Sequence, residues 1–220
     1  MIPKIIWQTY EINYQNLPNK ALILIDSWKK NNAEWEYNYI SAEQRKTFVK
    51  EHFGEEWYSI YSSYRLNVLR SDLWRYMCLY VHGGMYSDLD MLCKTPVERW
   101  LDTNKDFVVS IEPDFEGYTQ SIFASSPNNS VLKEVLDLIK EQYYKKIEYN
   151  DVISYETQET GYVIFSKAIT SYLHKNPSYN VDLLTGEESK NLHIDSIDHY
   201  YAGNGGIFDD SYISWKNETI

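Results

Sequence analysis

The clearest hydrophobic pattern in the chain runs from Ser63 to the glycine pair Gly83-Gly84. Apolar residues recur there at intervals of three and four, which is the spacing of a helix with one buried face. Glycine accepts the positive φ of a helix C-terminus without strain, so the glycine pair marks the end of that helix. The pattern therefore predicts a buried helix that ends at Gly83, with a strand beginning at Met85.

Weaker patterns in the rest of the chain predict a mixture of strands and helices. The predicted strands cover residues 2–9, 35–40, 107–111, 120–124 and 181–184. The predicted helices cover residues 19–30, 53–62 and 162–169, and two more begin at the caps Ser41 and Ser130. No internal repeat, low-complexity segment or Pro/Gly linker divides the 220 residues. We therefore expect one mixed α/β domain with helices on both faces of its sheet.

Two aspartates follow the central helix. Asp88 and Asp90 are two residues apart, so in a strand they project to the same side while Leu89 faces the other way. Adjacent carboxylates repel each other unless a cation lies between them. Ligation by oxygen alone suits magnesium or manganese, with positions left for water and substrate phosphates. A solvated turn after the strand is the competing interpretation.

Three further charged residues lie on the flanks of the central helix, namely Arg70, Asp72 and Arg75. That helix must pack beside the strand that carries the aspartates. Arginines in this position would neutralise a metal-bound diphosphate through bidentate hydrogen bonds. The combination favours a site for a phosphate-containing substrate over a solvated turn.

Composition excludes several classes of protein. The net charge of −11 argues against a nucleic-acid binder, which needs a basic surface to displace counterions. No stretch approaches the ~20 apolar residues of a membrane-spanning helix, and Met1 leads directly into a predicted strand, so we expect a cytoplasmic protein.

Cys78 and Cys93 are interpreted as reduced core residues. The 21 tyrosines and 7 tryptophans suit sugar stacking, membrane-interface contacts or ordinary packing.

Three blocks of the sequence resemble a known family. The central block comprises Arg70, Ser71, Asp72, Arg75, Tyr76, Leu79, Tyr80, Gly83, Gly84, Tyr86, Asp88 and Asp90. The opening run from Ile2 to Tyr10 is similar to the family's first strand, and Thr160-Gly161 resembles a third block. Together they resemble the DXD sugar-binding region of glycosyltransferase family 32, which includes fungal mannosyltransferases and bacterial capsule or lipopolysaccharide sugar transferases. Here Trp7 replaces the family's usual His, Tyr10 its usual Trp, and Tyr162 a common proline.

The resemblance implies a single domain of the GT-A type with a mostly parallel mixed sheet. Residues 1–110 would form the nucleotide-binding part, and residues 111–220 the acceptor side and a C-terminal flap. It places Asp72, Arg75, Asp88 and Asp90 in the catalytic centre, and Thr160 and Gly161 near the sugar. The residues it implies for binding the nucleotide-sugar donor are Trp7, Gln8, Thr9, Tyr10, Arg70, Asp72, Arg75, Tyr86, Ser87, Asp88, Gln120 and Trp215. Among these, Tyr10 would stack on the base and Gln120 would face the sugar.

The family also supplies a further metal ligand, a His close to a C-terminal Ser-Trp. This chain splits that pattern, because His199 lies well before Ser214-Trp215 while Asp209 and Asp210 occupy the expected spacing. We expect His199 to join Asp88 and Asp90 at the metal, since a neutral imidazole is a common metal donor. Asp209 and Asp210 are the rival ligands.

The resemblance implies a metal-dependent, retaining transferase with manganese or magnesium as cofactor. It would move a hexose from a nucleotide sugar, UDP-linked in preference to GDP-mannose, to a glycan or lipid-linked acceptor of surface polysaccharide synthesis. A cytoplasmic location with peripheral contact to the inner face of a membrane fits this function. Two other classes stay open. One is a non-catalytic carbohydrate-binding protein, and the other is a phosphatase with Asp-x-Asp on a strand, although Leu92 replaces the Thr or Val usual in such phosphatases.

Overall fold

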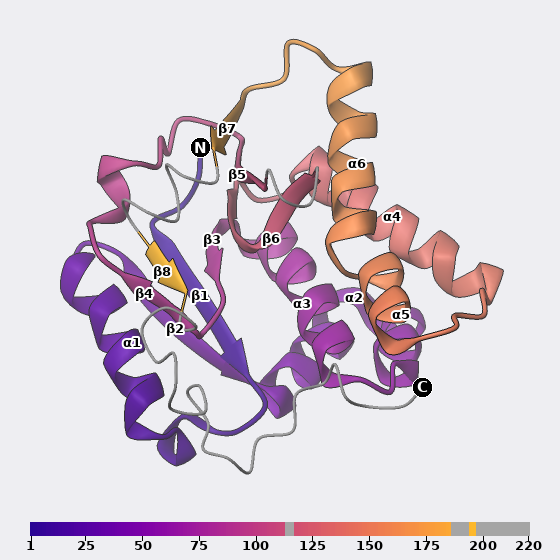
Figure 1. Cartoon of the computed structure of the whole chain (residues 1–220), viewed down its shortest axis with the longest axis horizontal. Coiled ribbons are helices and arrows are strands. Elements are labelled where there is room, and N and C mark those ends of the chain that lie inside the picture. Colours follow the sequence, from indigo (N-terminus) through magenta and orange to yellow (C-terminus); the bar gives the residue numbers. More distant parts are fainter. Residues whose placement is uncertain (113–116, 186–193, 197–220) are drawn as a thin grey trace.

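A six-stranded mixed sheet forms the centre of the protein in a computed structural model, which describes residues 1–112, 117–185 and 194–196 (Figure 1). The strands are β1 (Ile5–Tyr10), β2 (Glu36–Ser41), β3 (Gly84–Ser87), β4 (Met91–Cys93), β5 (Phe107–Glu112), β6 (Gly117–Ser125), β7 (Val181–Thr185) and β8 (Ile194–Ser196). The α-helices are α1 (Asn19–Asn31), α2 (Ala42–Ser63), α3 (Asn67–His82), α4 (Ser130–Lys145), α5 (Val152–Glu159) and α6 (Tyr162–Lys175). Two short 3-10 helices cover Tyr14–Asn16 and Val97–Arg99.

The strand order in the large sheet is β2-β1-β3-β6-β5-β7, and β4 and β8 form a separate pair. Neighbours β2 and β1, β1 and β3, and β5 and β7 are parallel, whereas β6 is antiparallel to both β3 and β5. This confirms the predicted mixed, mostly parallel sheet. The carboxyl ends of β1, β2 and β3 meet at one edge, where open α/β sheets bind their ligands.

Helices cover both faces of the sheet. Figure 1 shows α1 beside β4 on one side and α2 to α6 gathered on the other. On the first side Trp28 of α1 is fully buried in the same apolar cluster as Ile6 of β1. On the second side Leu73 and Met77 of α3 pack in one cluster with Phe123 of β6. The sheet is therefore packed between two apolar layers.

The central helix begins later than its periodicity predicts. Helix α2 runs on to Ser63, with a kink at Gly54 where φ is 76°, and α3 starts at Asn67. The predicted helix over residues 53–62 is therefore the second half of α2. As predicted, α3 ends at Gly83, whose φ is 66°. At Gly84 an added Cβ would lie 2.6 Å from the carbonyl oxygen of Ile5, so glycine is what lets β3 approach β1.

Two further differences concern helices α4 and α5. The side chain of Asn129, not Ser130, caps α4 by accepting from the Val131 amide at 2.9 Å, because the asparagine carbonyl reaches the first free amides of the helix. Helix α5 was absent from the prediction, since its eight residues show no clean apolar period. None of the described helices has the length and apolar content needed to cross a membrane.

Candidate active site

The two aspartates of the Asp-x-Asp motif lie on a turn between β3 and β4. The predicted strand ends at Ser87, and the Met91 amide donates to the Asp88 carbonyl at 3.3 Å across the turn. Leu89, only 4% exposed, packs into the apolar cluster made with α1. The turn is therefore anchored by Leu89, while Asp88 and Asp90 are half-buried on either side of it.

Side chains from two other positions hold the backbone of the motif. Gln8 donates its Nε2 to the Asp88 carbonyl at 2.9 Å, and the Ser87 hydroxyl donates to the same oxygen at 3.1 Å. The Tyr37 hydroxyl in turn donates to Gln8 Oε1 at 2.7 Å. Gln8 and Ser87, both predicted to contact the donor, are thus fully buried and engaged with the main chain of the turn.

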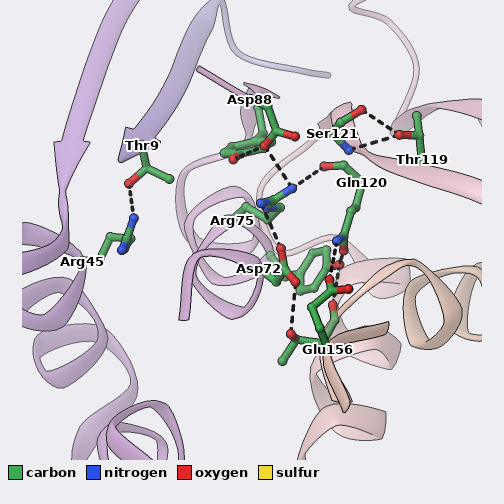
Figure 2. Close-up of polar contacts among 12 residues, drawn as sticks. Thr9, Arg45, Asp72, Arg75, Asp88, Thr119, Gln120, Ser121 and Glu156 are labelled. Atoms are coloured by element: carbon green, nitrogen blue, oxygen red, sulfur yellow. Dashed lines mark hydrogen bonds and ion pairs between the residues drawn. The ribbon is translucent and has the colours of Figure 1, made fainter. Parts of the chain in front are cut away.

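A single buried guanidinium joins the helix to the motif. Nη2 of Arg75 lies 2.9 Å from Asp72 Oδ1, and its Nη1 lies 3.2 Å from Asp88 Oδ1. Nη1 also donates to the carbonyl of Gln120 at 2.9 Å. Its guanidinium also stacks on the ring of Tyr86 at 4.4 Å. Figure 2 shows Arg75 between the two carboxylates. Sequence alone placed Arg75 on a helix flank, but a charge this buried is stable only when paired on several sides.

Tyr86 completes the contacts of Asp88. Its hydroxyl donates to Asp88 Oδ1 at 2.7 Å, the same oxygen that faces Arg75. Burial raises the pKa of Tyr86 well above the ordinary value, so the phenol stays a neutral donor. Two donors therefore converge on one oxygen of Asp88, whose side chain is 31% exposed.

Asp72 is the most deeply buried acid of the site. Besides Arg75, it accepts from the Thr160 hydroxyl at 3.1 Å and from the carboxyl of Glu156. The Tyr76 hydroxyl contacts the Gln120 side-chain oxygen and lies 2.8 Å from the Thr160 carbonyl. The structure thus brings together Asp72, Arg75, Asp88 and Gln120, four of the predicted site residues.

Glu156 and Tyr76 are site residues that sequence reasoning missed. Tyr76 belongs to the central block of the resemblance but was assigned no role, and Glu156 belongs to the unpredicted helix α5. A usable signal lay in the spacing between Glu156 and the third block. Glu156 and Thr160 are four residues apart, so in a helix they share one face.

A groove of about 400 Å³ lies beside the ends of β1 and β2, lined in part by Glu11, Arg45 and Arg70. Buried Arg45 donates to the Thr9 hydroxyl at 2.8 Å and pairs with Glu11. Arg70 donates to Asn67 at 3.1 Å. Of the predicted donor contacts, Arg70 therefore faces this groove, whereas Thr9 is held between Arg45 and the Ile40 carbonyl.

The remaining predicted residues are Trp7, Tyr10 and four that lie outside the described part of the chain. Trp7 donates to the Gly83 carbonyl at 3.0 Å and stacks on His82, at the opposite end of β3 from Asp88. Tyr10 packs against the apolar cluster that contains Leu89. His199, Asp209, Asp210 and Trp215 fall outside the described residues.

The chemistry of the turn fits a divalent cation. Asp88 and Asp90 offer carboxylate oxygens, the donors that magnesium and manganese prefer. Within residues 1–112, 117–185 and 194–196, no cluster of three or more His, Cys, Asp or Glu side chains forms a metal site. Two carboxylates suit a cation whose other positions are taken by water and phosphate oxygens.

Comparison with known proteins agrees with this arrangement. Residues 18–107 match the family described as "Glycosyltransferase sugar-binding region containing DXD motif". Over 98% of the chain, the sequence is 26% identical to an uncharacterized glycosyltransferase of Acanthamoeba polyphaga mimivirus, 84% of which is covered. These matches identify the chain as a glycosyltransferase that is similar to this DXD family.

Another relative is considerably longer than this glycosyltransferase. It is 27% identical to the initiation-specific alpha-1,6-mannosyltransferase of Schizosaccharomyces pombe over 87% of the chain, and spans about half (54%) of that relative's length. Its fold is similar to the UDP-bound glycosyltransferase domain of the YGT toxin, with a TM-score of 0.59 and 10% identity over 87% of this chain and 82% of that one. The phosphatase and carbohydrate-binding alternatives are therefore set aside, and the GT-A expectation is confirmed.

Proposed function

We propose that the glycosyltransferase moves a hexose from a nucleotide sugar in a reaction that requires a divalent cation and retains the anomeric configuration. The position of Arg75 carries this proposal. One buried guanidinium pairs with Asp88, beside the candidate cation site, and with Asp72, which would bind sugar hydroxyls. A donor lying across this pair would present its diphosphate to the turn and its hexose to Asp72.

Each side chain has a defined part in the proposed reaction. Asp88 and Asp90 would hold magnesium or manganese, which supplies Lewis-acid stabilisation for the charge on the departing diphosphate. Arg75 stays positively charged at every relevant pH and orients Asp72. Because Asp72 and Asp88 both pair with Arg75, neither suits the role of nucleophile. We therefore propose attack by the acceptor hydroxyl on the face from which the diphosphate leaves.

The relatives and the groove support a choice of donor to test first. Mannose is the first hexose to test because the fission yeast relative is named a mannosyltransferase, and UDP is the nucleotide named for the toxin domain. The groove lined in part by Arg45 and Arg70 would take the base. The proposed acceptor is a glycan or lipid-linked oligosaccharide of surface polysaccharide synthesis, reached by peripheral contact with the inner face of a membrane.

A thermal-shift panel tests the donor site. UDP, GDP, UDP-hexoses and GDP-mannose are each added with manganese, magnesium or EDTA. A ligand that binds the native state raises the melting temperature by mass action. We expect a metal-dependent rise with one nucleotide, lost in Asp90→Asn and kept in the matched variant Asp26→Asn, whose carboxylate is exposed on α1. No shift with any nucleotide and metal would sink the proposal. NMR of the product's anomeric proton then distinguishes retention from inversion.

A further inference from the structure

Glu156 is a buried acid that the proposed reaction does not yet use. It lies on α5 and is 5% exposed. Its carboxyl hydrogen-bonds to the Asp72 carboxylate, and its Oε1 accepts from Gln120 Nε2 at 3.4 Å. Figure 2 shows Glu156 below Gln120 and on the side of Asp72 away from Asp88. It therefore contacts two side chains that are expected to face the donor sugar.

The backbone is shaped to accept this side chain. A Cβ at Gly161 would lie 2.4 Å from Glu156 Oε1 and 2.7 Å from the Thr157 Cα. The Gly161 amide also donates to the Glu156 carbonyl at 2.9 Å. The Thr160-Gly161 pair thus has two roles, because Thr160 binds Asp72 while Gly161 leaves room for Glu156.

The charges around Glu156 decide its protonation state. Asp72, Arg75 and Tyr76 face it from α3, and neutral Gln120 faces it from β6. Arg75 already pairs with two carboxylates, Asp72 and Asp88, so a third negative charge here would be uncompensated. Burial and the neighbouring Asp72 charge raise the pKa of Glu156 to about 9. At neutral pH, Glu156 carries the proton of the Glu156-Asp72 hydrogen bond.

We propose that Glu156 is a positioning residue for the donor sugar, acting as a neutral acid that donates to Asp72 and accepts from Gln120. It fixes the orientation of both side chains without adding charge to the sugar pocket. This inference rests on the proposed function, because it assumes that Asp72 and Gln120 face the sugar. Protonated Glu156 is needed for this arrangement, since an ionised carboxylate would repel Asp72.

Three variants separate this role from its alternatives. Glu156→Gln keeps a donor for Asp72 and an acceptor for Gln120 with the same shape, whereas Glu156→Leu removes both. We expect kcat/KM at pH 7 to stay within a few-fold for the Gln variant and to fall about a hundredfold for the Leu variant, the scale of loss from misplaced substrate contacts. The control Glu159→Leu removes another buried acid of α5, which pairs with Tyr149 instead, and should leave kcat/KM of the folded protein unchanged.

The pH profile is the second readout of activity. Wild-type kcat/KM should show a falling limb as Glu156 ionises near pH 9, and Glu156→Gln should lack the part of that limb due to Glu156. If Glu156→Gln loses as much activity as Glu156→Leu, the acid acts in its ionised form and the inference is wrong. If both variants match the wild type, Glu156 positions nothing.

A stability measurement keeps the inference testable even if no donor is found. The folded-state pKa of about 9 exceeds the ordinary value of 4.5, so between these pH values the folded state binds more protons than the unfolded state. Wild-type stability should therefore fall as pH rises from 5 to 9. The unfolding free energy of Glu156→Gln relative to wild type should rise over the same range. A difference independent of pH would overturn the neutral-acid assignment, whereas absent nucleotide binding would count only against the proposed function.

Discussion

The hydroxyl of Thr160 donates to Asp72 Oδ2 at 3.1 Å, joining residues 88 positions apart in the sequence. Both side chains are fully buried. This bond links the start of the α6 segment to the charged face of α3, so the third block of the sequence and the central block form one site. The contact can be removed by a single change of nearly equal volume.

Thr160→Val should lower the free energy of unfolding by about 1–3 kcal/mol, because it leaves a buried carboxylate with one hydrogen bond fewer. Urea denaturation measures the change. Thr170→Val is the matched control, since Thr170 is exposed on α6, and it should change stability by less than about 0.5 kcal/mol. Equal midpoints for Thr160→Val and wild type would show that the bond contributes nothing.

Arg75→Lys should lower the stability of the protein although it keeps the positive charge. A lysine ammonium cannot reach Asp72, Asp88 and the Gln120 carbonyl together, as the planar guanidinium does. Leaving one buried acceptor unsatisfied costs about 1–3 kcal/mol of unfolding free energy. The comparison is Arg65→Lys, at an exposed position. Indistinguishable melting temperatures for the two variants would contradict the bridging role of Arg75.

Leu89→Ala should weaken the fold and the motif together. Leu89 is buried between the two aspartates, and truncating a buried leucine costs about 2–5 kcal/mol. Because Leu89 anchors the turn, metal-dependent nucleotide binding should weaken as well, measured by titration calorimetry below the melting temperature. Leu183→Ala removes the same atoms from a side chain 38% exposed on β7 and should do neither. Normal binding by a destabilised Leu89→Ala would show that the turn holds its shape without this anchor.

Gly161→Ala should destabilise the protein by about 1–3 kcal/mol, because the added methyl overlaps Glu156 Oε1 and the Thr157 Cα. Shortening the acid with Glu156→Asp should relieve part of the overlap. The double variant is therefore expected to be more stable than the sum of the single changes, by a coupling of about 0.5 kcal/mol or more. Strict additivity would mean that the strain lies in the backbone alone.

Much of the fold was predictable because local chemistry decides it. The period of α3, its glycine stop and the strands β2, β5 and β7 all follow from side chains within a few residues of each element. The two carboxylates of the Asp-x-Asp motif, two residues apart, were likewise evident from the sequence. Leu89 is buried while the two aspartates are half-buried, but the prediction that the motif lies in a strand was wrong, because β3 ends at Ser87 and the motif forms a turn.

Burial of the polar residues was not predictable in the same way. From their spacing, Asp72 and Arg75 are expected to be charged residues on the flanks of a helix. They are buried only because α3 packs against β6 and α5. Gln8 and Ser87 resembled ligand contacts but hold the Asp88 carbonyl, because the register of β1 beside β3 brings them to it. Glu156 was missed for the same reason, since its partners Asp72 and Gln120 lie 84 and 36 residues away.

The strand order has a consequence for how the enzyme is made. Strand β3, which leads into Asp88, lies between β1 from the start of the chain and β6, which ends at Ser125. Pairings that close such long stretches of chain form late in folding. The Gln120 carbonyl that holds Arg75 also comes from β6. A nascent chain therefore cannot assemble the proposed donor pocket until β6 has left the ribosome, and translation products that end before β6 should lack it however well their helices form.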